Sequence, residues 1–295
     1  MRPQLAALLA LMLLLSGCVA EAVASAAPTE PPPPTTVAAP PLNPCNFYDA
    51  PLASRHLEAA EPRALPGLRA ITVPHYAPEL DLLADVLAGQ EADAFDCIVV
   101  LGPDHTGRGG GISVSGRGWR TPLGTLTGSE AAARRLLDSP AIAAIENHAL
   151  LAEDHAVSTL MPYLAYALPD AAVASVLISR YTALARLEAL ADALVELGEE
   201  ARLLVVLSLD FSHYQTPDAA SLCDAETVAL IESGDLIPTL NLQSTHVDCP
   251  EALALLLLLG NRLALTPRLE ASRLTTFVEN GAPMAGSFMV WSLRD

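Results

Sequence analysis

The sequence contains no lysine, because all 16 of its basic residues are arginine. This absence excludes a lysine Schiff base and a phosphate-binding P-loop, since both need a lysine amine. Charged residues are also scarce, at 17% of the 295 residues, and the 34 acidic side chains leave a net charge of −18. Nucleic acids and anionic membrane surfaces bind basic patches, so the charge balance argues against both as partners of the folded protein.

Motifs of two common enzyme classes are missing as well. No Gly-x-Ser-x-Gly turn occurs, which argues against a serine hydrolase. The glycine-rich stretch 107–118 lacks the spacing of a dinucleotide-binding loop, and we interpret it as a loop beside a site. Hydrophobic residues make up 52% of the chain, which predicts a substantial core rather than a disordered chain.

The N-terminus has the pattern of a secretory signal peptide over residues 1–17. A basic start precedes an apolar run over 5–15, which is too short to span a bilayer as a helix of about 20 residues. Leu15-Ser16-Gly17-Cys18 resembles the lipobox of bacterial lipoproteins, which implies cleavage before Cys18 and a lipid on its sulfur. An ordinary signal peptide with a coincidental cysteine is the alternative. We expect an exported protein, lipid-anchored at the cell surface or in the periplasm.

Residues 18–44 are rich in Pro, Ala and Thr and predict an extended tether that links the lipid to a folded domain over 45–295. That domain contains the four remaining cysteines: Cys45, Cys97, Cys223 and Cys249. An exported protein can form disulfides, and the sequence leaves their pairing open. Pairing of Cys45 with Cys97 or with Cys223 is one expectation.

Apolar runs alternate with helical patterns throughout residues 45–295. The expected strands are 68–73, 95–101, 112–115, 124–127, 172–178, 202–209, 269–278 and 287–293. The expected helices are 79–88, 129–137, 154–168, 183–197, 217–231 and 250–259. This alternation predicts a layered α/β fold with a mostly parallel or mixed central sheet flanked by helices. The two final strands follow one another and predict a locally antiparallel or mixed region.

Polar side chains directly follow three of the predicted strands: His75 after 68–73, His105 after 95–101, and Asp210 with His213 after 202–209. Ligands of open α/β sheets bind at the carboxyl ends of the strands, so we expect these side chains to form a site.

Cys249 is a further candidate because Pro250 suits the first position of a helix. A helix N-terminus favours a thiolate, which is a metal ligand or a nucleophile. A disulfide or a buried thiol is the alternative, and His246 is a weaker candidate as a local ligand.

Six segments, in order, resemble motifs of the Memo family, also called AmmeMemoRadiSam system protein B. They are Val73-Pro74-His75-Tyr76, Leu101-Gly102-Pro103-Asp104-His105-Thr106-Gly107, Trp119-Arg120-Thr121-Pro122-Leu123-Gly124, Glu153-Asp154-His155-Ala156-Val157, Ser208-Leu209-Asp210-Phe211-Ser212-His213-Tyr214 and Cys249-Pro250. The resemblance implies a fold similar to that of LigB-type class III extradiol dioxygenases. It also implies a metal site formed by His75, His105 and Cys249, with iron or copper as the metal.

Two histidines and one anionic ligand leave coordination positions open for a substrate, and such a site also suits zinc. We expect His155 and His213 to act as acid or base beside the metal. Asp210 would orient His213 or a metal ligand, and Asp154 would orient His155. Three functions compete: a dioxygenase-type oxidoreductase acting on an unidentified small molecule, a non-catalytic metal-binding or sequestering lipoprotein, and a degenerate scaffold with Cys249 in a disulfide.

Overall fold

In the computed structural model, which describes residues 41–295, eight strands form one mixed central sheet. In spatial order they are β10 (Arg268–Glu279), β11 (Ala282–Arg294), β2 (Leu68–Val73), β9 (Leu203–Ser208), β3 (Cys97–Pro103), β8 (Ala172–Ile178), β4 (Ile112–Ser115) and β7 (Ile145–Glu146). The four strands β2, β9, β3 and β8 are parallel, whereas β10, β11 and β4 pair antiparallel with their inner neighbours. The predicted mixed α/β sheet and its antiparallel final strands are confirmed.

The apolar sequences of the central strands explain their position in the sheet. All six residues of β9, Leu-Leu-Val-Val-Leu-Ser, are buried, and so are six of the seven in β3 and in β8. A strand that is buried on both faces needs apolar side chains on both, and β-branched residues suit its pleated backbone. These strands therefore pair in the middle of the sheet, with an apolar core packed on each of its faces.

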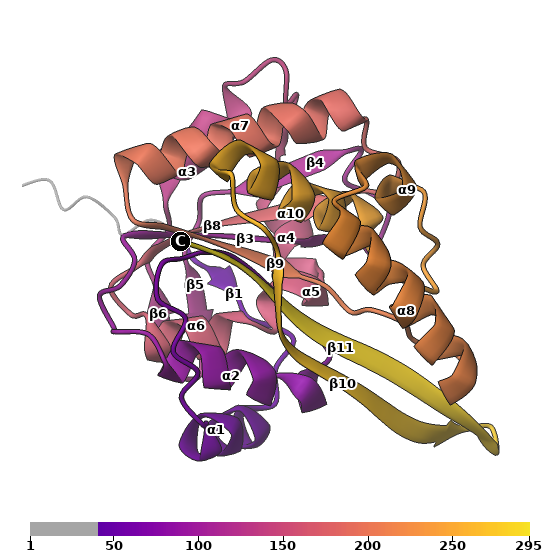
Figure 1. Cartoon of the computed structure of the whole chain (residues 1–295). Helices are drawn as coiled ribbons and strands as arrows, with labels where there is room; N and C mark the ends of the chain where they lie inside the picture. The colour runs from indigo at the N-terminus through magenta and orange to yellow at the C-terminus, as the bar shows by residue number, and fades with distance from the viewer. Residues whose placement is uncertain (1–40) are drawn as a thin grey trace, which may run out of the picture. The chain divides into compact units, whose positions relative to one another are not determined.

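Helices cover both faces of this sheet (Figure 1). The described helices are α1 (Ala50–Ala59), α2 (Asp81–Ala88), α3 (Glu130–Leu137), α4 (His148–Glu153), α5 (His155–Ser158), α6 (Met161–Ala167), α7 (Leu184–Glu200), α8 (Pro217–Ser233), α9 (Leu236–Leu240) and α10 (Pro250–Leu263), with a 3₁₀ turn η1 (Ala77–Glu79). One core lies between the sheet and α3, α7 and α10, and a second lies between the sheet and α2 and α6. Among the described residues, no helix combines the length and the hydropathy needed to cross a membrane.

A second, small sheet corrects two boundaries of the sequence prediction. It consists of β1 (Asn43–Pro44), β5 (Trp119–Thr121) and β6 (Gly124–Leu126). The strand expected at 124–127 therefore belongs to this sheet and not to the central one. Asn43 is buried, and its N–H donates to the carbonyl of Gly118 at 2.8 Å, so the fold includes the last residues of the predicted tether. The predicted signal peptide, Cys18 and the rest of the tether lie outside the described residues.

The helix expected over 154–168 is divided into α5 and α6. Pro162 lies in the first turn of α6. Backbone N–H groups in a first turn make no hydrogen bond within the helix, so a proline is tolerated there. Asp154 is the N-cap of α5, and its carboxylate accepts the N–H of Ala156 at 2.9 Å. Asp154 also ends α4, so its cap places His155 at the very start of a short helix.

The β10–β11 hairpin extends beyond the rest of the sheet (Figure 1). Arg273 on β10 holds the hairpin at its side. The guanidinium donates to Glu79 at 2.6 Å and to both carboxylate oxygens of Asp81 at 2.9 Å. Glu79 also accepts the hydroxyl of Thr275 at 2.7 Å. These contacts join the hairpin to η1 and to the start of α2.

All four cysteines of the described residues are free, so none of the expected disulfides forms. Each thiol has different neighbours: the carbonyl of Ser158 for Cys45, the hydroxyl of Ser129 for Cys97, the side-chain oxygen of Gln215 for Cys223 and the carbonyl of Ile178 for Cys249. Burial raises the pKa of the Cys45 thiol to about 12, in spite of a backbone contact to Phe47 that lowers it.

We therefore expect all four thiols to be found in the unreduced protein. Alkylation after unfolding without reductant, followed by peptide mass mapping, measures each of them. The alkylated form should dominate at every one of the four positions, because no two of them are placed as a disulfide pair. A peptide pair linked through any two would contradict the arrangement.

Candidate metal centre

The carboxyl ends of three neighbouring strands deliver three polar side chains to one edge of the sheet. His75 follows β2, Asp210 follows β9 and His105 follows β3, and these strands lie side by side and parallel in the order β2-β9-β3. Parallel strands end at the same edge, which is where ligands of open α/β sheets bind. The structure thus brings together the side chains that were singled out at the strand ends.

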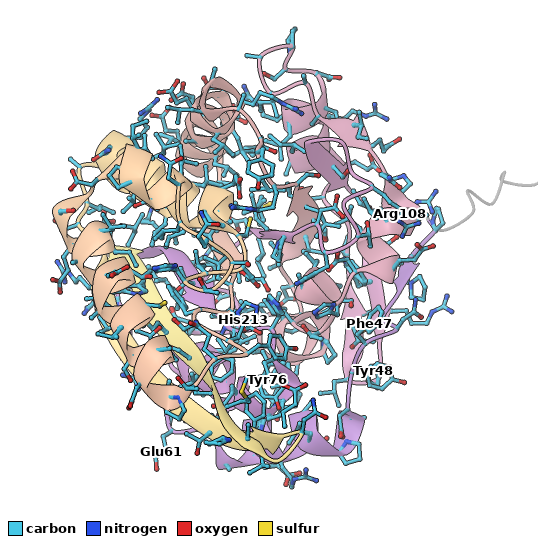
Figure 2. All side chains as sticks on the ribbon, turned by 90° about the vertical axis from the view of Figure 1, so that its right-hand side faces the viewer. Phe47, Tyr48, Glu61, Tyr76, Arg108 and His213 are labelled. Atoms are coloured by element: carbon cyan, nitrogen blue, oxygen red, sulfur yellow. The ribbon has the colours of Figure 1, made fainter. Side chains whose placement is uncertain are left out.

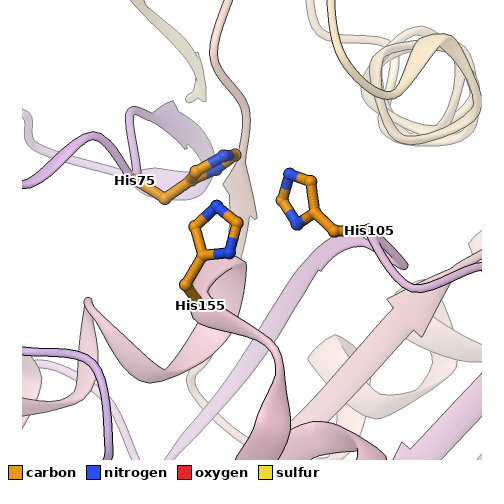
Figure 3. Close-up of side chains that lie close together, drawn as sticks. All are labelled: His75, His105 and His155. Atoms are coloured by element: carbon orange, nitrogen blue, oxygen red, sulfur yellow. The ribbon is translucent and has the colours of Figure 1, made fainter.

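A third histidine completes a cluster with His75 and His105. His155, at the start of α5, has a ring nitrogen within 4.8 Å of a ring nitrogen of each of the other two (Figure 3). The rings of His105 and His155 stack with their centroids 4.1 Å apart, and the ring of His75 meets both edge-on at 5.2 and 5.3 Å. Three imidazole nitrogens at this spacing could hold one metal ion.

The hydrogen bonds of His105 direct one ring nitrogen toward the cluster. Its Nδ1 lies 2.9 Å from Oδ1 of Asp154, and its backbone N–H donates to Oδ2 of the same carboxylate at 2.9 Å. A carboxylate only accepts, so Nδ1 carries the proton and Nε2 is left with a lone pair. This arrangement of carboxylate and histidine is the one that orients histidine ligands of metals. The predicted partner of Asp154 was His155, and the structure gives it His105 instead.

The tautomer of His75 follows from a similar contact. Its Nδ1 lies 3.1 Å from the hydroxyl oxygen of Ser208, and that hydroxyl itself donates to the carbonyl of Ala156. Nδ1–H of His75 is therefore the donor, and Nε2 has the lone pair. Burial lowers the pKa of His75 well below its usual value, and the positive charges that His105 and His155 would carry lower it further. The neutral, metal-binding form of His75 is the stable one at neutral pH.

Two aspartates lie beside His75, one of which the sequence analysis did not single out. Nε2 of His75 is 3.5 Å from Oδ2 of Asp210 and 3.2 Å from Oδ2 of Asp248. Burial raises the pKa of both carboxyl groups, and the neighbouring charge of Asp210 raises that of Asp248 further. Asp210 also accepts the backbone N–H of His75 at 3.0 Å, so it holds the loop after β2 in place.

A cavity of about 430 Å³ opens above the histidine cluster. His75, His105 and His155 line its floor together with both aspartates, and His213 lines it as well. Nδ1 of His213 donates to the carbonyl of Phe211 at 2.7 Å, which leaves Nε2 as the unprotonated nitrogen of the neutral ring.

The wall of the cavity is aromatic. Tyr76 stacks on Phe288 of β11 with centroids 5.5 Å apart, and Phe277 of β10 and Tyr214 line the cavity too. Figure 2 shows Tyr76 and His213 near the β10–β11 hairpin, on the face turned to the viewer. The long hairpin therefore supplies a wall that the strand ends alone would not provide.

The structure departs from the expected ligand set at Cys249. Its thiol is buried, with the carbonyl of Ile178 and the carboxylate of Glu251 both at 3.9 Å, and it is not among the clustered ligand atoms. Burial raises the pKa of this thiol well above its usual value, and the charges of Glu251 and Asp248 raise it further. In the absence of a metal ion, the thiol form of Cys249 is therefore favoured over the thiolate. His246 is paired with Glu226 at 3.0 Å.

Fold and site together define an α/β protein with a histidine cluster that could hold a metal ion. The sequence profile of the family described as Memo-like protein matches residues 53–248, which is more than half of the chain. The chain therefore belongs to the Memo-like protein family, and the resemblance seen in its motifs is confirmed.

Curated relatives agree with this assignment. A MEMO1 family protein of Desulfurococcus amylolyticus is 31% identical over 138 residues, which cover 45% of this chain and 48% of the relative. A MEMO1 family protein of Methanosarcina mazei is 31% identical over 150 residues, covering 50% and 53%. The chain thus spans about half the length of the curated relatives it matches. An uncharacterized protein of Escherichia coli K12 aligns in structure at 15% identity with a TM-score of 0.48, over 75% of this chain and 99% of the other.

The contacts of Asp154 lead to a prediction for Asp154→Asn. Burial alone would raise the pKa of Asp154, but its hydrogen bonds from His105 and Ala156 outweigh burial and lower it. A lowered pKa in the folded state stabilises the fold above the unfolded-state pKa, and the contribution is lost as the pH falls through the folded-state value. We expect the variant to lose about 1–3 kcal/mol of unfolding free energy at pH 7.

Urea unfolding at pH 7 and at several values below pH 4 measures this loss, with metal chelated throughout. The deficit should shrink toward the acidic end, because the wild-type carboxylate is then protonated as well. Asp170→Asn, at an exposed turn, is the matched control and should unfold like the parent at every pH. An equal deficit at all pH values would contradict the role of the Asp154 charge.

Proposed function

We propose that this protein binds a metal ion at His75, His105 and His155 and acts there, as an oxidoreductase of dioxygenase type, on a small molecule held in the adjoining cavity. The observation that carries the proposal is the convergence of three imidazoles, with ligand atoms within 4.8 Å of one another, at the floor of a cavity of about 430 Å³. A closed structural site would have no such cavity above it, whereas a catalytic site keeps a position open.

The donor set fits a transition metal. Metal–nitrogen bonds of about 2.0–2.1 Å place the ligand atoms of one ion about 3–4 Å apart, and the three ring nitrogens lie within 4.8 Å of one another. The Nδ1 protons of His75 and His105 are both directed away from the cluster, to Ser208 and to Asp154. Imidazole suits iron, copper and zinc, and we propose iron or copper as the resident metal, with zinc as the third candidate.

The residues of the site have different proposed roles. A bound metal would supply Lewis acidity toward an oxygen of the substrate. Asp154 orients His105, Ser208 orients His75, and aromatic side chains form one wall of the cavity. His213 is the proposed acid or base, because its Nε2 has a free lone pair and its ring lines the same cavity.

We further propose that the protein works outside the cytoplasm on a lipid anchor at Cys18. This proposal depends on the sequence pattern around Cys18 and on the tether that follows it. Acylation contributes roughly 0.8 kcal/mol per buried CH₂ group, so two or more acyl chains hold a protein at a membrane. A net charge of −18 would keep the folded part off an anionic bilayer.

Metal content after anaerobic loading with Fe(II), Cu(I) or Zn(II) tests the metal proposal. The parent should retain about one equivalent of the cognate ion after desalting, and His75→Ala, His105→Ala and His155→Ala should each lose most of it, because each removes a ligand. His56→Ala is the matched control, since His56 contacts Tyr163 at 2.9 Å and lies outside the cluster.

Two results would contradict parts of the proposal. Absence of metal from the parent, or full retention in all three variants, would exclude the histidine site. Retained metal with no oxygen uptake across a screen of small molecules would exclude the oxidoreductase and leave a metal-holding protein.

The anchor is tested with the full chain expressed in a bacterium that processes lipoproteins. We expect the parent in the membrane fraction with an acyl label and Cys18→Ser in the soluble fraction without it. Cys223→Ser, which removes a thiol of α8, should behave like the parent. Unlabelled parent protein in the soluble fraction would rule out lipid attachment.

A further inference from the structure

We propose that the segment 43–47, which precedes the region matched by the family model, positions His155 and thereby completes the histidine cluster. This inference rests on the proposed function, because it assigns a role at the same metal centre. The match to the Memo-like family begins only at residue 53, so the segment is an addition to the matched region. Figure 2 shows Phe47 of this segment on the face of the molecule that also carries Tyr76 of the cavity.

The ring of His155 is held differently from the other two rings of the cluster. His75 and His105 each have a hydrogen-bond partner at Nδ1, whereas the ring of His155 has none among residues 41–295. Packing orients it instead. It stacks on His105, and the ring of Phe47 lies 6.0 Å from it between centroids, at an angle of 58°. Aromatic rings at this distance pack favourably, so Phe47 is the contact of the segment with a proposed metal ligand.

The helix that begins at His155 is short because the hydrogen bonds of the helical backbone are interrupted on both sides of it. In a continuous helix the carbonyl of Ala152 would accept the N–H of Ala156. That N–H donates instead to the carboxylate of Asp154 at 2.9 Å. Nδ2 of Asn46 takes its place and donates to the Ala152 carbonyl at 3.1 Å. Asn46 thus joins the segment 43–47 to the end of α4.

The second interruption comes from a proline. The carbonyl of Ser158, the last residue of α5, would accept the N–H of residue 162, but Pro162 has none. The thiol of Cys45 donates to this carbonyl at 3.1 Å. Burial raises the pKa of that thiol to about 12, so it keeps its proton at neutral pH and remains a donor. Cys45 and its neighbour Asn46 therefore supply the donors that the two interruptions remove.

The backbone of the segment is fixed by strands and not by the helices that it contacts. The N–H of Asn43 donates to the carbonyl of Gly118 at 2.8 Å, and the N–H of Cys45 donates to that of Arg120 at 3.2 Å. The side chain of Asn43 also donates to the hydroxyl of Ser115 on β4 at 3.3 Å. The segment therefore connects both sheets to α5, and it fixes the start of α5 relative to the strand ends.

Zn(II) affinity, measured by chelator competition, tests the contact between Phe47 and His155. We expect Phe47→Ala to weaken binding about tenfold, because the ring of His155 loses a neighbour that orients it. Tyr48→Ala is the matched control and should stay within about twofold of the parent. Tyr48 is the next residue, is similarly exposed at 49% against 40% for Phe47, and lies beside α1.

The two side-chain donors are tested in the same assay. Cys45→Ala removes the thiol donor, and Asn46→Asp keeps the shape of the side chain but replaces its donor with an acceptor. Both should weaken Zn(II) binding. Cys45→Ser retains an O–H donor and should restore most of the affinity that Cys45→Ala loses. Cys97→Ala removes a thiol that contacts Ser129 and should bind Zn(II) like the parent.

Hydrogen exchange of the metal-free protein gives a readout that needs no metal. Peptides of α4 and α5 should exchange faster in Phe47→Ala, Cys45→Ala and Asn46→Asp than in the parent, whereas peptides of α7 should be unchanged. Faster exchange throughout the protein would indicate general destabilisation and overturn the positioning role.

Parental Zn(II) affinity in Phe47→Ala, Cys45→Ala and Asn46→Asp would also overturn it, and so would an equal loss in Tyr48→Ala. In these cases loss of metal from His75→Ala, His105→Ala and His155→Ala would leave the proposed function intact. A parent that binds no metal would overturn the proposed function and this role together.

Discussion

The parallel pairing of β2, β9 and β3 is the constraint on which the site depends. Hydrogen bonds between these strands align Val73 with Ser208 and Leu101 with Leu207, so the three chains leave the sheet at one level. His75, Asp210 and His105 then follow within a few residues of their strand ends. A shift of one residue in either pairing would turn every side chain of a strand to the opposite face and separate the cluster.

Elements far apart in the sequence complete what the strand ends begin. The start of α5, capped by Asp154, places His155 against His105, and the segment before α10 adds Asp248. The β10–β11 hairpin adds the aromatic wall, and Arg273 holds that hairpin against Glu79 and Asp81. These groups lie far apart in the sequence. The site therefore forms only when the sheet, the helices and the hairpin have packed together.

The site gathers ionisable groups that are costly to charge. Burial and neighbouring charges lower the pKa of His75 and His155, and burial raises the pKa of two carboxyl groups, Asp210 and Asp248. Asp154 is the exception, because its hydrogen bonds keep its pKa low and make it a stable anion behind His105. Functional sites commonly concentrate such unfavourable groups, and the apolar sheet and helices around them supply the compensating stability.

The sequence by itself determined the alternation of strands and helices, the family, and His75 and His105 as partners, because apolar runs and strand-end positions are local patterns. It did not determine the third member of the histidine cluster. Cys249 at a helix start was the better candidate from local chemistry, yet its thiol turns into the core while Asp248 and His155 face the cavity. The packing of α10 against the sheet decides which of the adjacent side chains Asp248 and Cys249 faces the cavity. That packing is a property of the tertiary structure, since it follows from contacts between residues distant in the chain.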